Sequence, residues 1–144
     1  QEYTAAGQAS YFAWYEFYPN PWQQLPYVIS PGDAISASVN YQKHAFYLQM
    51  TDSTRGWTWN SKAVRFPSAS LASAEWIEEA PSFGGKIAYL ANFGGVGFSS
   101  CTWNNGQSPL ASGFVNLVDS SGFNEDQTSG PSGNSFSITW LRCD

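Results

Sequence analysis

Short runs of β-branched and aromatic residues, separated at near-regular intervals by turn signals, dominate this 144-residue chain. Alternation of apolar and polar residues predicts strands, and no stretch has the apolar spacing and capping residues of a helix. Turn signals such as Ser30-Pro31-Gly32-Asp33 divide the runs. The predicted strands are residues 9–18, 25–29, 34–41, 45–52, 58–66, 73–79, 87–91, 95–102, 114–118 and 135–141. Many short strands predict an all-β fold, an antiparallel β-sandwich of jelly-roll or concanavalin-like type with two packed sheets.

The length of the chain predicts a single domain over residues 1–144, because no linker or internal repeat divides it. Charged residues make up only 12% of the chain, about half the usual share of roughly 25%. The surface must therefore be rich in uncharged polar residues, which suits a secreted protein. The net charge of −5, with six scattered Lys and Arg residues, argues against nucleic acid or an anionic membrane surface as a partner. No apolar run approaches the roughly 18 residues that span a bilayer.

The two cysteines, Cys101 and Cys143, lack the spacing of metal ligands, and the only histidine is His44. We therefore expect no metal site, and we interpret His44 as a surface strand residue. In a secreted protein the two cysteines predict a disulfide between the middle of the chain and its C-terminal part. Two buried free thiols are the alternative.

Residues 11–19, Tyr-Phe-Ala-Trp-Tyr-Glu-Phe-Tyr-Pro, carry a carboxylate inside an aromatic run. Side chains alternate faces along a strand, so Trp14, Glu16 and Tyr18 are expected on one face. A carboxylate among aromatic rings costs free energy if it is buried without a partner. The three residues therefore fit two interpretations equally well. They line a ligand-binding groove, or they form a buried core face from which the Glu16 side chain extends to the solvent at the edge of the sheet.

Residues 73–81, Ser-Ala-Glu-Trp-Ile-Glu-Glu-Ala-Pro, form a second run with acids inside it. Alternation predicts that Glu75, Ile77 and Glu79 share one face and that Glu78 points the other way. Glu79 stands where the strand ends, a common place for a catalytic group. Taken alone it is more often a solvated residue, because Glu is usually exposed. Glu75 is a candidate supporting acid on the same face.

Four segments, residues 11–19, 29–35, 73–79 and 90–98, follow the order and approximate spacing of motifs in a known family. On these segments the chain resembles the eqolisin family of glutamic peptidases, which are acid endopeptidases. The resemblance implies a β-sandwich of two antiparallel sheets, protein or peptide substrates, an acidic extracellular setting, and no metal or organic cofactor. It also implies roles for individual residues. The last Glu of Ala-Glu-Trp-Ile-x-Glu is catalytic and is here Glu79, while Trp14, Glu16 and Tyr18 line the substrate cleft.

The chain departs from the family pattern in three ways. Glu78 stands where the family usually has an aliphatic residue, and Asn92 where it often has Asp. The family's second catalytic residue, a glutamine after a Trp-Val-Gly-Ile-Asp-Gly motif, has no counterpart upstream of Tyr11. We therefore expect this chain to be the larger, C-terminal portion of the enzyme. A light chain or N-terminal segment would supply the glutamine and complete the sandwich, and Gln1 acting through a shifted loop is the weaker alternative.

The sequence alone leaves three alternative functions open: two unrelated to peptidases and one that of a non-catalytic relative of the peptidase. A jelly-roll glycoside hydrolase needs paired carboxylates about 5–5.5 Å apart if it retains configuration. Glu75 and Glu79 lie about 13 Å apart along a strand, at about 3.3 Å per residue, which disfavours them as that pair. A secreted carbohydrate-binding module would bind sugars through exposed aromatic residues, and the seven Trp residues of this chain could serve that purpose. A non-catalytic relative of the peptidase is the third alternative.

Overall fold

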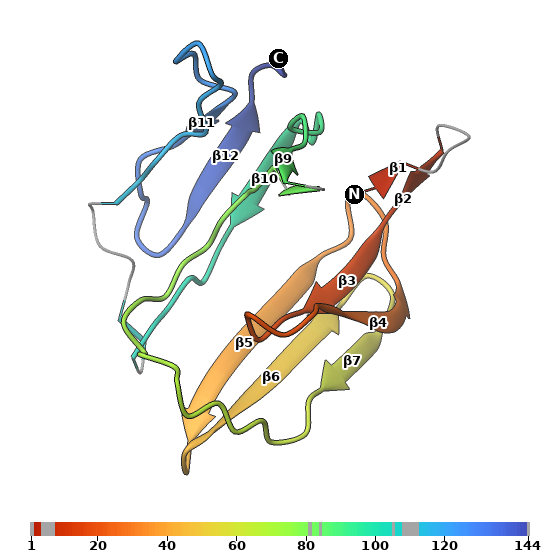
Figure 1. The fold of residues 1–144 in the computed structure, drawn as a ribbon, viewed down its shortest axis with the longest axis vertical. Coiled ribbons are helices and arrows are strands. Elements are labelled where there is room, and N and C mark those ends of the chain that lie inside the picture. The colour runs from red at the N-terminus through yellow and green to blue at the C-terminus, as the bar shows by residue number, and fades with distance from the viewer. Residues whose placement is uncertain are drawn as a thin grey trace. The chain divides into compact units, whose positions relative to one another are not determined.

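The protein is all-β over the residues that the computed structural model describes, which are 2–3, 8–80, 82–83, 85–104, 106–107 and 113–143 (Figure 1). Every strand pair among them is antiparallel, as the sequence predicts. Within these ranges no helix is long and apolar enough to cross a membrane. The chain forms two compact units, Gln1–Leu71 and Ala72–Asp144, each with its own sheets. The expected single sandwich domain stays a prediction.

The first unit contains three small sheets. Its strands are β1 (Glu2–Tyr3), β2 (Ala9–Ser10), β3 (Phe12–Tyr15), β4 (Gln23–Val28), β5 (Ile35–Gln42), β6 (Ala45–Asp52) and β7 (Trp57–Asn60). They pair as β1–β2, as β3–β4 and as a three-stranded sheet in the order β5–β6–β7. The predicted strand 58–66 is shorter than expected, because beyond Asn60 only a single bridge, Phe46 with Val64, continues the pairing.

Aromatic rings join the two larger sheets of this unit. Tyr15 of β3 stacks on Trp59 of β7 with ring centroids 5.1 Å apart. Tyr27 of β4 stacks on Trp57 at 4.6 Å. Leu25, at 2% exposure, is the most buried apolar residue of β4. These contacts remove apolar surface from water and hold β3 in place.

Two turns flank strand β5 of the three-stranded sheet. Lys43 and His44 form the two-residue turn between β5 and β6, with φ of 51° and 60°. His44 is thus a turn residue, and its interpretation as a strand residue is wrong. At the other end, Asp33 closes the turn from Ser30 by accepting its backbone N–H at 2.7 Å. The guanidinium of Arg55 also binds Asp33 and holds the pKa of that carboxyl below its ordinary value.

The second unit centres on a three-stranded sheet in the order β10–β12–β11. Its strands are β8 (Ser82–Phe83), β9 (Lys86–Ile87), β10 (Gly95–Phe98), β11 (Asp126–Thr128) and β12 (Phe136–Trp140). Across the ladder, Phe98 stacks on Phe136 at 4.8 Å, and Ile138 is buried at 5% exposure.

The composition of residues 119–133, rich in Gly, Ser and other polar residues, predicts one long surface loop, but this stretch contains a capped turn and strand β11, so that prediction is wrong. The Oδ1 atom of Asp119 accepts the backbone N–H groups of Ser121 and Phe123 and so caps a tight turn. After this turn the chain enters β11. Residues 114–118, predicted as a strand, contribute only one bridge, at Val118.

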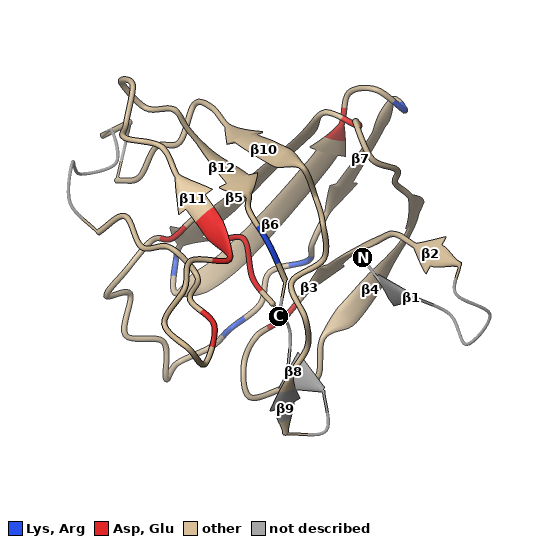
Figure 2. Cartoon of the chain, turned by 90° about the horizontal axis from the view of Figure 1, so that it is seen from above, with Lys and Arg blue, Asp and Glu red and all other residues tan. Residues whose placement is uncertain are grey.

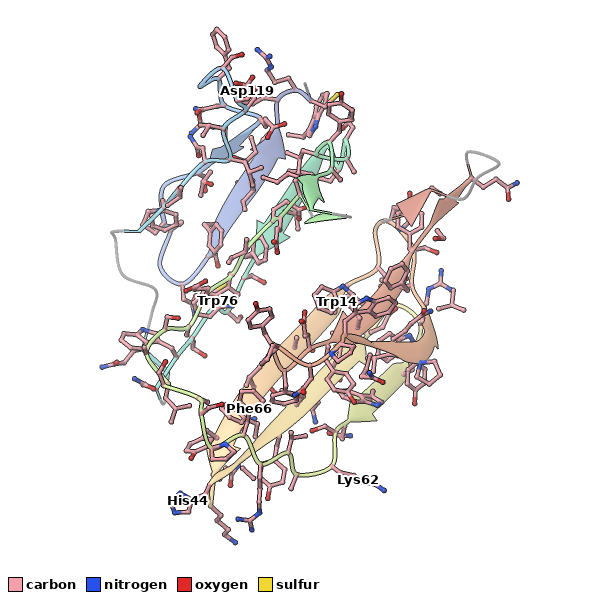
Figure 3. All side chains as sticks on the ribbon, in the orientation of Figure 1. Trp14, His44, Lys62, Phe66, Trp76 and Asp119 are labelled. Atoms are coloured by element: carbon pink, nitrogen blue, oxygen red, sulfur yellow. The ribbon has the colours of Figure 1, made fainter. Side chains whose placement is uncertain are left out.

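The segment 73–79, also predicted as a strand, pairs with no strand among the described residues (Figure 1). Trp76 lies on this trace in Figure 3. Residues 72–80 make no hydrogen bond to any other described residue. A β-strand is defined by its backbone hydrogen bonds to a neighbouring strand. Among the described residues this segment has no such neighbour, so it shares with a strand only the alternation of its side chains between two faces.

Both cysteines are free thiols, and the predicted disulfide between Cys101 and Cys143 is not formed in this structure. Cys101 is buried at 3% exposure, whereas Cys143 is exposed to solvent. Burial raises the pKa of the Cys101 thiol, which makes it an unreactive apolar side chain.

Candidate functional site

The aromatic stripe of the first unit follows the predicted alternation. Trp14, Glu16 and Tyr18 are exposed, with Tyr18 at 81%, while Ala13 is buried at 6%. Trp14 lies on β3 in Figure 3. The ladder of β3 ends at Tyr15, so Glu16 and Tyr18 continue the alternation beyond the strand. Two exposed rings on either side of an exposed carboxylate offer apolar contact and a negative charge to a ligand.

Two further aromatic side chains hold this stripe from behind. Phe17 contacts Phe46 at 5.8 Å and Phe66 at 5.9 Å between ring centroids. Tyr15 stacks on Trp59. The packed face of residues 13–17 therefore fixes the backbone from which the exposed face projects.

The acid-bearing segment of the second unit also alternates. Glu75, Ile77 and Glu79 are exposed, and Ile77 reaches 60% exposure. Glu78 is half-buried, and Ala80 is buried at 7%. The sequence predicted this division correctly, although the segment has no ladder. The exposed Glu79 carboxylate is open to water and to a substrate.

Glu78 points into a cavity of about 690 Å³ within the second unit. Trp76, Trp103 and Phe114 line this cavity together with the acids Glu75, Glu78 and Asp126. Burial raises the pKa of the Glu78 carboxyl, and the negative charge of Asp126 raises it further. Figure 2 shows the acidic start of β11, where Asp126 lies, in red.

The structure brings Glu75 and Glu79 to one exposed side of a single segment, and it places Trp14, Glu16 and Tyr18 on one exposed face of the first unit. Their roles in catalysis and binding stay predictions. Sequence reasoning missed the Glu78–Asp126 pair. The alternation that turns Glu78 inward could have predicted its half of the pair. Nothing in the polar sequence around Asp126 predicts that Asp126 is buried.

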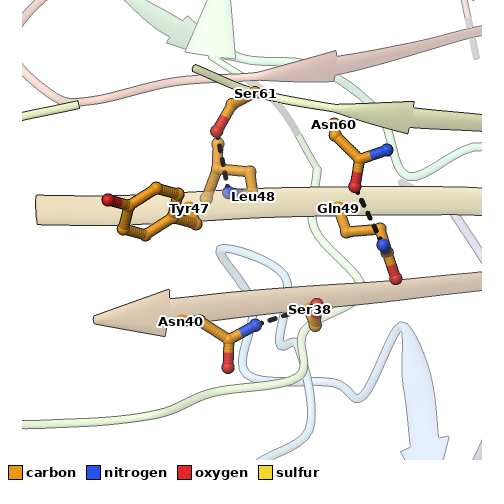
Figure 4. Close-up of a pocket in the computed structure, with 7 residues that line it drawn as sticks. All are labelled: Ser38, Asn40, Tyr47, Leu48, Gln49, Asn60 and Ser61. Carbon is orange, nitrogen blue, oxygen red and sulfur yellow. Dashed lines mark hydrogen bonds between the residues drawn. The ribbon is translucent and has the colours of Figure 1, made fainter. Parts of the chain in front are cut away.

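A smaller polar depression lies on the β5–β6–β7 sheet (Figure 4). Its side chains mostly bind one another. Gln49 donates to Asn60 at 2.8 Å, and Ser61 accepts the backbone N–H of Leu48 at 2.9 Å. Since these groups already have partners, the depression offers little to a ligand. Within the described ranges, no group of three His, Cys, Asp or Glu residues is arranged to hold a metal ion.

Comparison with known proteins gives three consistent matches. The profile of the Peptidase A4 family matches residues 1–140. Aspergillopepsin-2 of Aspergillus niger is 29% identical over 117 residues, which cover 78% of this chain and 42% of that protein. The chain therefore spans less than half the length of that curated relative. The crystal structure of aspergilloglutamic peptidase from Aspergillus niger matches with a TM-score of 0.81 and 27% identity, over 94% of this chain and 82% of that one.

Proposed function

This chain belongs to the Peptidase A4 family, the eqolisins or glutamic peptidases, and we propose that it is the glutamate-bearing part of an acid endopeptidase. The observation that carries the proposal is the exposed carboxylate of Glu79, which ends an Ala-Glu-Trp-Ile-x-Glu motif in a chain matched by the family profile. We further propose an extracellular, acidic setting, which agrees with the low content of charged residues.

In this mechanism the Glu79 carboxylate accepts a proton from a water molecule, and that water attacks the scissile carbonyl carbon. An amide N–H of a glutamine donates a hydrogen bond to the oxygen that becomes negative. The protonated Glu79 then gives its proton to the leaving amine. By resemblance to the acid endopeptidases of this family, we expect both steps to run best in acid.

The glutamine comes from polypeptide outside residues 1–144, either a separate light chain or a preceding segment of the same chain. The support is the lack of the family's glutamine motif upstream of Tyr11. Gln1, the alternative source, lies outside the described residues. Trp14, Glu16 and Tyr18 hold the substrate by ring contact and charge, and Glu75 supports Glu79 from the same side of the segment.

Glu79→Gln tests this function in the protein assembled with its glutamine-bearing segment. We expect a loss of at least about 10²-fold in kcat on a denatured protein substrate at acid pH, because general-base catalysis contributes about that much. Glu75→Gln makes the same change on the same side of the segment and should lose far less. Full activity of Glu79→Gln would refute the proposal.

Intact mass and N-terminal sequencing of every polypeptide in the native preparation test the source of the glutamine. A co-purifying chain or a longer N-terminus that contains Trp-Val-Gly-Ile-Asp-Gly and a later Gln would support it. An active preparation that holds only a chain beginning at Gln1 would contradict it.

A further inference from the structure

Trp22 is an exposed aromatic residue that lies outside the predicted site. It is 51% exposed and stands directly before β4. A turn, in which the Asn20 N–H donates to the Phe17 carbonyl at 2.9 Å, leads the chain back to β4, which pairs with β3. The Trp22 ring stacks on the ring of Phe12, with centroids 5.7 Å apart and 21° between the ring planes. Trp22 is therefore held in place although half of its surface is open to water.

Trp22 lies on the same face of the β3–β4 hairpin as Trp14. In the ladder Trp14 is opposite Gln24, and residues directly opposite each other share a face. Trp22 stands two positions before Gln24, so the alternation of side chains places it on that face as well. The other face carries Leu25, which is buried, and Tyr27, which stacks on a ring of the neighbouring sheet. The outward face of the hairpin therefore carries both tryptophans.

This outward face suits a substrate better than a permanently bound protein. Exposed aromatic residues gathered on one face mark an interaction surface, and Trp and Tyr are enriched among the residues that dominate binding energy. The exposed Glu16 belongs to the same face, and it forms no ion pair with any residue that the structure describes. A permanently bound chain would bury this carboxylate without a partner, which costs free energy. A substrate bound in contact with water leaves the carboxylate solvated.

We propose that Trp22 binds an aromatic side chain of the peptide substrate and so sets a sequence preference of the peptidase, an inference that rests on the proposed function. The exposed part of the indole offers a flat apolar surface, on which another ring gains from offset stacking. Phe12 restrains the indole before the substrate arrives, and this preorganisation lowers the entropy lost on binding. Such a contact stabilises the bound substrate and the transition state alike, so its loss raises KM more than it lowers kcat.

Peptide binding to the Glu79→Gln variant tests the inference without a catalytic readout. The protein is used as it is isolated, together with any polypeptide that co-purifies. The probe is an acetylated and amidated nine-residue peptide of alternating Ser and Thr with one central Phe, and its matched control carries Ala in place of Phe. Affinity is measured by fluorescence anisotropy of labelled peptides. In this background Trp22→Ala removes the ring, Trp22→Phe keeps a smaller ring, and Tyr47→Ala removes an exposed aromatic side chain of β6. Circular dichroism checks that each variant is folded.

We expect the Phe peptide to bind about two- to tenfold more tightly than the Ala peptide, which is the range that one aromatic pair contributes. Trp22→Ala should abolish this preference, whereas Trp22→Phe should keep most of it and Tyr47→Ala should leave it unchanged. Equal affinity for the two peptides, or a preference that survives in Trp22→Ala, would overturn the inference. Failure of the protein with Glu79 intact to hydrolyse a denatured protein would refute the proposed function instead, and the binding data would still decide whether Trp22 holds an aromatic side chain.

Discussion

Phe17→Ala tests whether the packed face of residues 13–17 holds the exposed stripe. A fully buried Phe side chain contributes about 1.5–3 kcal/mol, and the half-buried Phe17 contributes about half of that. Its ring pairs with Tyr15, Phe46 and Phe66 each add about 0.5 kcal/mol or more. We expect Phe17→Ala to lower the free energy of unfolding by about 2–3 kcal/mol.

The assay is urea unfolding followed by tryptophan fluorescence, with Tyr18→Ala as the matched control. Tyr18 is the next residue along, is also aromatic, and is 81% exposed. Its replacement should change the free energy of unfolding by no more than about 0.5 kcal/mol, as is usual for surface positions. Equal destabilisation by the two variants would refute the alternation on which the stripe depends.

Three further predictions concern charge, thiol chemistry and a turn. The folded-state pKa of Asp33 is lowered, chiefly by its bond to Arg55, from an ordinary value of 3.8. The stability that this carboxylate contributes is therefore complete above about pH 3.8 and is lost as pH falls through the lower folded-state pKa. Arg55→Ala should flatten that acid loss in urea titrations at several pH values, and an unchanged acid loss would contradict the pairing. Iodoacetamide should modify the exposed Cys143 at least about tenfold faster than the buried Cys101, as measured by peptide mass, since the thiolate is the reactive form. Equal rates, or no reaction at either thiol, would contradict this. Asp119→Ala should cost about 2 kcal/mol in unfolding free energy because two backbone N–H groups lose their acceptor. Asp119→Asn keeps that acceptor and should cost clearly less, so equal losses would show that the Oδ1 bonds are not the cause.

Local pattern was sufficient where a segment's own residues decide its structure. The predicted strand 45–52 coincides with β6, whose apolar and polar residues alternate between two flanking turns. The common face of Trp14, Glu16 and Tyr18 was likewise predictable, because the side-chain period of an extended chain is two, whereas its exposure was not, since a core face fitted the pattern equally well.

Local pattern failed where conformation depends on unusual residues or distant ones. A two-residue hairpin with positive φ normally uses Asn or Gly, so Lys43 and His44 give no turn signal. Asp119 and Asp126 stand in a polar stretch that reads as solvent-exposed loop, yet both are buried because backbone N–H groups bind their carboxylates. The segment 73–79 was predicted as a strand but pairs with none among the described residues, for another reason. Strand pairing depends on a second strand, and the sequence of one strand does not specify whether its partner is present.

The adjacent glutamates Glu78 and Glu79 show how a single step along an extended chain places two carboxyl groups in different surroundings. Glu79 is exposed, where its carboxyl is open to water and to a substrate. Glu78 is half-buried against Asp126, where its ionised form is costly unless a cation joins it. Glu79→Gln should therefore lose peptide hydrolysis, whereas Glu78→Gln removes a charge that its half-buried position disfavours.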